Sequence, residues 1–214
     1  MKKVLGTEQT ESNMAAAKDT GSGHIRGSAA RMSTFSQMLS VGDLRSDGLA
    51  NEVVRLVSEN PALLADLMEE FGASNPAVRG HAADALEKIA RVHPEDVARH
   101  LPTLIGLARH DSVAMVRWHL AMTFGHLAEL PEVGEQIQAP LLALLKDPSA
   151  FVRSWAITSL CIIARMTPTK AGGIARAISP LANDRSAAVA KRARTALRAL
   201  TEPAARPPAS WLKR

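Results

Sequence analysis

A repeat of about 37 residues runs through most of this 214-residue chain and constrains its fold more than any other feature. Prolines spaced by 33, 37 and 37 residues give the first marker: Pro61, Pro94, Pro131 and Pro168. Valines spaced by 38, 36 and 37 residues give the second: Val78, Val116, Val152 and Val189. Because two independent markers share one period, the sequence predicts an array of similar structural units.

Each unit has the pattern of two helices. After each repeated valine, apolar residues recur at steps of three and four, which marks one face of an α-helix. The first such stripe is Val78, Ala82, Ala85, Leu86 and Ile89. The spaced proline is expected to open the first helix of a unit, as proline does at a first helical position. Three turn aspartates are expected to cap the second helices: Asp111, Asp147 and Asp184. Inner prolines predict a kink in the first helices: Pro102, Pro140 and Pro180.

Composition excludes several other classes of protein. Aromatic residues make up only 3% of the chain, which argues against an all-β sandwich or barrel. The single cysteine excludes a disulfide framework and a cysteine-rich zinc site, and it is compatible with a reducing compartment. The longest apolar run, near residues 160–164, is far too short to span a bilayer, and no secretion signal opens the chain. We therefore expect a cytoplasmic protein with no membrane segment.

The repeated segments resemble HEAT repeats, which are helical units of the armadillo type. The resemblance rests on the Leu-Pro of the first helix, the Asp turn, the Val-Arg pair and the Ala/Leu-rich second helix, and it covers about residues 41–201. It implies an all-α fold, a right-handed α-solenoid of about four to five helix pairs, with the second helices lining the concave face. It also implies that the turn aspartates pair with three recurring arginines as a structural ladder: Arg79, Arg117 and Arg153. The last unit departs from the pattern, since Ala190 replaces the arginine.

The chain is expected to contain three parts. Residues 1–40, rich in small and polar side chains, predict a disordered N-terminal tail. Residues 41–201 form the repeat domain, and residues 202–214 form a proline-rich C-terminal tail. Trp211 in that tail either docks on a partner or folds back on the last repeat, and burial of its indole is the simpler expectation. The net charge of +5 is concentrated at the C-terminal end, while residues 41–110 are acidic.

Helical geometry selects candidate partner-binding residues on the second helices. With the apolar stripe facing inward, six side chains of the middle units are expected on the concave face: Trp118, Met122, Trp155, Thr158, Cys161 and Arg165. Trp155 also fits a simpler role, packing between repeats. The last helix carries four basic residues, which suit either a solubilising cap or contact with phosphate or an acidic protein: Lys191, Arg192, Arg194 and Arg198.

Motifs of enzymes and cofactor sites are missing from the sequence. It contains no His-Glu dipeptide, no H-E-x-x-H, no phosphate loop and no G-x-S-x-G. His119 and His126 are seven residues apart and could share a helix face, but two neutral side chains without carboxylates make a poor metal site. Cys161 lies in an apolar run, which favours an inert thiol. The sequence therefore predicts no enzyme, no cofactor and no metal.

Together these features predict a non-catalytic scaffold or adaptor that binds a protein or peptide on its concave face. The first alternative is a nucleic-acid-binding protein that uses the basic C-terminal repeat, although the acidic start of the array argues against a full-length DNA cradle. The second is an accessory protein of the DNA-repair or bilin-lyase type, which rests on fold analogy with HEAT-like glycosylases and lyases. The oligomeric state stays open.

Overall fold

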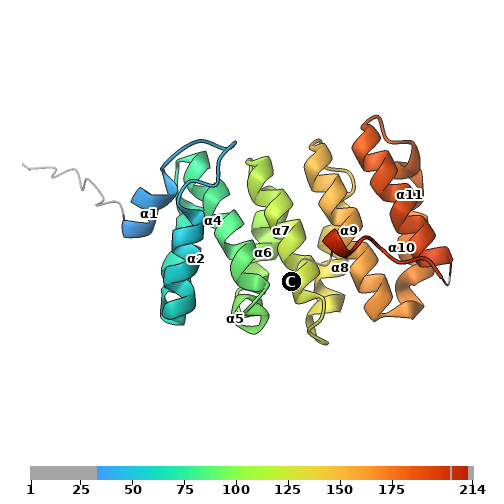
Figure 1. Cartoon of the computed structure of the whole chain (residues 1–214), viewed down its shortest axis with the longest axis horizontal. Coiled ribbons are helices and arrows are strands. Elements are labelled where there is room, and N and C mark those ends of the chain that lie inside the picture. The colour runs from blue at the N-terminus through green and yellow to red at the C-terminus, as the bar shows by residue number, and fades with distance from the viewer. Residues whose placement is uncertain (1–32, 203, 212–214) are drawn as a thin grey trace, which may run out of the picture. The chain divides into compact units, whose positions relative to one another are not determined.

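The computed structural model describes residues 33–202 and 204–211, and every regular element in these ranges is helical (Figure 1). The helices are α1 (Thr34–Leu39), α2 (Ala50–Glu59), α3 (Leu64–Glu69), α4 (Pro76–Ala90), α5 (Pro94–Ala98), α6 (Leu101–His110), α7 (Ala114–Leu127), α8 (Val133–Leu144), α9 (Ala150–Met166), α10 (Ala171–Ile178) and α11 (Ala187–Thr201). Short 3₁₀ segments lie between or after them: η1 (Pro61–Leu63), η2 (Glu70–Gly72), η3 (Pro168–Lys170), η4 (Ser179–Asn183) and η5 (Ala209–Trp211). None of the helices in this part of the chain is long and apolar enough to cross a membrane.

The helices form an α-solenoid, as predicted. The second helices of the units pack in chain order, α2 on α4, α4 on α7, α7 on α9 and α9 on α11 (Figure 1). The first helices α6, α8 and α10 pack on the second helices of their own units. The repeated valines anchor this arrangement, because all four have no exposed surface: Val78, Val116, Val152 and Val189.

Prolines shape the first helices as their backbone chemistry requires. Pro61 begins η1, where the Asn60 side chain accepts a hydrogen bond from the N–H of Ala62, and Pro94 begins α5. The inner prolines act less uniformly than predicted. At Pro102 the helix is interrupted and restarts as α6, whereas Pro140 lies inside the continuous helix α8.

An arginine ladder ties successive units together. The Nε atoms of Arg79, Arg117 and Arg153 lie 3.0, 2.6 and 2.9 Å from carboxylate oxygens of the next unit. Their partners are Asp111, Asp147 and Asp184. Each arginine also donates from Nη1 to a backbone carbonyl of its own turn, at 2.7–2.8 Å. These side chains are largely buried, so each rung fixes the offset between neighbouring repeats.

The turn aspartates organise the start of each second helix, though not as N-caps. Each carboxylate accepts a hydrogen bond from the backbone N–H two residues later, at Val113, Ser149 and Ser186. Those three residues occupy the N-cap positions of α7, α9 and α11. The aspartate therefore holds the turn that precedes the helix, while both of its carboxylate oxygens also accept hydrogen bonds from the arginine. The hydrogen bond from Arg153 lowers the pKa of Asp184.

The ladder ends without a leftover charge at either side. The turn before α4 has Asn75 in place of an aspartate, and its side chain caps the N–H of Ala77 at 2.9 Å. The corresponding arginine position in α11 is Ala190, which is buried. The first turn thus lacks the acid and the last helix lacks the base.

The boundaries of the tails differ from the prediction where the structure describes them. Helix α1 lies within the expected tail 1–40, and it is folded because Phe35 and Leu39, four residues apart, are buried and the helix packs on α4. The rest of that expectation, residues 1–32, lies outside the described residues. At the other end, residues 204–211 turn back from α11 across α9 (Figure 1). Trp211 is buried there, as the simpler expectation held.

The ladder predicts a large effect of one substitution. Arg117→Ala should lower the free energy of unfolding by about 3 kcal/mol, because it leaves the buried Asp147 carboxylate without its charged partner. Urea unfolding followed by circular dichroism measures the change. Arg109→Ala, at an exposed position of α6, is the matched control and should change stability by less than about 0.5 kcal/mol. Equal losses in the two variants would contradict a structural role for the ladder.

Candidate binding site on the inner face

One surface of the second helices carries both aromatic and ionisable side chains. We call it the inner face and define it by Lys88 on α4, His126 on α7, Trp155 and Ile162 on α9, and Arg192 on α11, all of them partly exposed. These residues come from helices that are neighbours in the solenoid (Figure 1).

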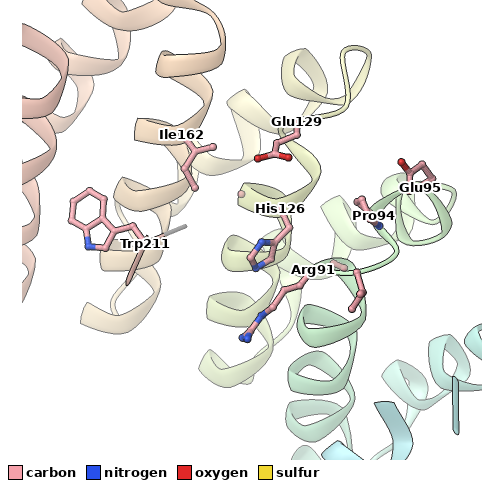
Figure 2. Close-up of a pocket in the computed structure, with 10 residues that line it drawn as sticks. Arg91, Pro94, Glu95, His126, Glu129, Ile162 and Trp211 are labelled. Atoms are coloured by element: carbon pink, nitrogen blue, oxygen red, sulfur yellow. The ribbon is translucent and has the colours of Figure 1, made fainter. Parts of the chain in front are cut away.

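A cleft of about 330 Å³ opens on this face between α4 and α9. Figure 2 shows Ile162 and Trp211 on one side of it, Arg91 and Glu95 on the other, and His126 between them. The cleft combines an apolar wall with charged groups. It is therefore suited to an amphipathic segment rather than to a purely apolar ligand.

The C-terminal segment covers the part of the inner face that belongs to α9 and α11. Trp211 is only 8% exposed and Pro207 is buried as well. The Arg192 guanidinium carbon lies 5.3 Å from the Trp211 ring centre and 4.7 Å from that of Trp155. Arg192 also donates from Nη1 to the Thr158 hydroxyl at 2.8 Å. The cation is thus held against two indoles, and burial lowers its pKa.

The predicted aromatic and apolar contact residues occupy different places. Trp155 is partly buried on the inner face, and Met122 is 8% exposed beside it. Trp118 instead lines a separate hollow with Leu44 and Phe151, whose ring centre lies 4.5 Å from that of Trp118. The Trp118 indole N–H is buried and has no hydrogen-bond partner among the described residues.

The structure departs from the expectation at Thr158 and Cys161. Thr158 is 1% exposed and Cys161 is fully buried, so neither presents its side chain to a partner. The physical reason is that α9 packs on both α7 and α11, which cover positions that an isolated helix would expose. Arg165, one turn further along, is exposed as expected.

The predicted basic patch is smaller in the structure. Lys191, Arg194 and Arg198 are exposed on α11, whereas Arg192 points into the aromatic contact described above. Arg194 donates to the carbonyl of Ala182, and Arg198 lies 3.5 Å from Glu202. Of the four residues in the predicted patch, Lys191, Arg194 and Arg198 therefore remain exposed.

A buried polar cluster joins α4 to α7. Asp84 and Glu87 on α4 are 5% and 0% exposed, and they face His119 and His126 on α7. His126 Nε2 lies 2.8 Å from Glu87 Oε1, while His119 Nδ1 lies 3.8 Å from Asp84 Oδ1. The premise that the two histidines have no carboxylates beside them was wrong, because the preceding repeat supplies them. The sequence signal for this cluster was the spacing of its residues. Asp84 and Glu87 are three residues apart, about one helical turn, and His119 and His126 are seven apart, about two turns, so each pair shares a helix face.

Cations and hydrogen bonds set the protonation of this cluster. Lys88 Nζ lies 2.8 Å from Asp84, and Arg91 Nε donates to Glu87 at 2.9 Å. Burial alone would raise the pKa of Glu87, but the hydrogen bonds from His126 and Arg91 outweigh it and lower that pKa to about 2. Burial lowers the pKa of His119 to about 4 against the attraction of Asp84 and Glu87, so this imidazole is neutral at pH 7. Asp84, Glu87 and His119 are the described residues whose donor atoms lie close enough together to hold a metal ion.

Comparison with known proteins supports the fold. No protein-family model matches the chain, and a search of curated proteins finds no match. Among solved structures, the chain is similar to the designed armadillo repeat protein YIII(Dq)4CqI, with a TM-score of 0.53 and 20% sequence identity. The similarity covers 78% of this chain and 80% of that one. The chain therefore has the fold of an α-solenoid of armadillo/HEAT-type repeats.

The buried cysteine leads to a prediction about its reactivity. Burial raises the pKa of the Cys161 thiol to about 11, with Arg165 opposing the shift, so both access and thiolate formation are suppressed. A disulfide reagent at pH 8 should modify the native protein at least about 1,000-fold more slowly than the urea-unfolded chain, because reaction requires opening. Absorbance of the released thiol measures the rate. Rapid modification of folded protein would show that Cys161 reaches the surface after all.

Proposed function

We propose that this protein is a non-catalytic, cytoplasmic repeat scaffold that binds an extended segment of a partner protein along its inner face. The observation that carries the proposal is the chain's own C-terminal segment. Residues 205–208 cross this face without helical structure and lead into the short η5 helix, with Pro207 and Trp211 buried and the Trp211 indole against Arg192.

The chemistry of the covered surface defines the kind of partner. Trp155, Ile162 and the stem of Arg192 offer apolar and cation–π contacts to an aromatic side chain. The adjoining cleft carries the exposed acidic residues Glu95 and Glu129. In the chain's own sequence Trp211 is followed by Leu-Lys-Arg. We therefore propose a partner segment that carries proline, a tryptophan and then basic residues.

Binding of nucleic acid is less well supported. The exposed cations at the C-terminal end of the array include Arg185 and Arg206 besides Lys191, Arg194 and Arg198. The inner face beside α11 is aromatic, however, and its cleft carries acidic side chains. Acidic side chains repel phosphate, so a nucleic acid would gain its contacts at one end of the array and not along the inner face.

A labelled peptide with the sequence of residues 203–214 tests the proposal in full-length protein. Trp211→Ala should free the part of the inner face that Trp211 covers. This variant should therefore bind the peptide at least about tenfold more tightly than the wild type does, because one cation–π and aromatic contact contributes about that factor. Fluorescence polarisation measures both affinities. A peptide with alanine at the tryptophan position should bind the Trp211→Ala protein with an affinity lower by a similar factor.

Matched variants distinguish peptide binding on the inner face from binding on other surfaces. Adding Trp155→Ala to the Trp211→Ala protein should weaken peptide binding, whereas adding Trp118→Ala, which removes an indole from the separate hollow, should not. Equal binding in all variants would contradict the proposed site. Salt-sensitive binding of duplex DNA that is lost in Lys191→Ala would favour the nucleic-acid function instead.

A further inference from the structure

The polar cluster between α4 and α7 has the composition and spacing of a metal site. One donor atom from each of Asp84, Glu87 and His119 lies within 4.8 Å of the others, and all three residues are buried. Ligands of one transition-metal ion, bound at about 2.0–2.2 Å, lie roughly 3–4 Å apart. Small side-chain rotations are therefore enough to bring the three donors onto a common ion.

A second observation, independent of the carboxylates, points to a missing ligand. His119 is 8% exposed, and its Nδ1 atom is buried without a hydrogen-bond partner among the residues that the structure describes. Nδ1 is directed at Asp84, but the separation of 3.8 Å is too long for a hydrogen bond. A buried polar nitrogen left unsatisfied costs about 1–3 kcal/mol, and coordination of an ion would remove that cost.

The surrounding cations can release the carboxylates. The side chains of Lys88 and Arg91 are 21% and 26% exposed, so their charged ends reach water. Lys88 Nζ also donates a hydrogen bond of 2.7 Å to Asn51 and lies 3.9 Å from Asp47, so other acceptors are at hand if an ion takes Asp84. His126, which contacts Glu87 at 2.8 Å, would orient that carboxylate toward the ion.

We propose that Asp84, Glu87 and His119 bind one divalent transition-metal ion, of the Zn²⁺ or Co²⁺ type, between helices α4 and α7. An imidazole nitrogen beside two carboxylate oxygens favours such ions over Mg²⁺ and Ca²⁺, which prefer oxygen ligands alone. The ion joins two successive repeats, because α4 and α7 belong to neighbouring units (Figure 1). This site does not depend on the proposed peptide binding.

Metal titration of the full-length, tag-free chain tests the site. After treatment with a chelator, calorimetry should show one Zn²⁺ per chain, and Co²⁺ should give a visible absorption band that Zn²⁺ removes and excess Mg²⁺ does not. His119→Gln should lower the Zn²⁺ affinity at least about tenfold. Lys88→Met should raise it, since it removes the cation that competes for Asp84.

The two variants are expected to change the Zn²⁺ affinity in opposite directions, which a general loss of stability would not do. His110→Gln, an exposed histidine at the end of α6, is the matched control and should bind Zn²⁺ as the wild type does. An affinity of the wild type within about threefold of His119→Gln, or an equal loss in His110→Gln, overturns the proposal. If circular dichroism shows that His119→Gln is unfolded, Lys88→Met decides: a gain in affinity supports the site and no gain overturns it.

Discussion

The bidentate contact between an arginine of one repeat and the turn aspartate of the next fixes the geometry on which the rest of the structure depends. Apolar packing between helices tolerates small rotations and slides, whereas a guanidinium held at its Nε by a carboxylate and at Nη1 by a backbone carbonyl does not. Each rung also holds the turn that leads into a second helix. The rotation of α4, α7, α9 and α11 is therefore set together with the stacking of the units, and so is the set of side chains that meet on the inner face.

The sequence was sufficient to predict most of the helices and their grouping into units, because these follow from local periodicity. The ladder between units was expected from the resemblance to HEAT repeats. Outside the ladder, periodicity was not sufficient to predict which side chains of neighbouring units meet. A helical wheel treats α9 as an isolated cylinder and places Cys161 on a free surface, whereas packing on α7 and α11 buries it. The proximity of Asp84 to His119 likewise depends on the offset between two helices. Helix α1 could not be predicted from periodicity, because its six residues contain a single pair of buried apolar side chains, Phe35 and Leu39.

The inner face has two chemically different halves. On α4 and α7 it is polar, with the buried Asp84, Glu87 and His119 beneath the partly exposed Lys88, Arg91 and His126. On α9 and α11 it is aromatic, and a single arginine lies between two indoles, one of which arrives from the end of the chain. The cleft lies where these halves meet, at His126 and Ile162. A ligand that spans it would encounter charge at one end and aromatic surface at the other.

The substitutions at the two ends of the ladder have a consequence for how such an array can change in length. Each internal unit brings one turn aspartate and one arginine, while Asn75 and Ala190 omit the acid at the start and the base at the finish. Duplicating or deleting a whole internal unit would therefore preserve the balance of buried charge, since the acid and the base come and go together. Extension beyond either end would instead require an acid at the position of Asn75 or a base at that of Ala190. Asn75 and Ala190 therefore mark the two ends of the ladder, and the number of internal repeats can vary between them without leaving a buried charge unpaired.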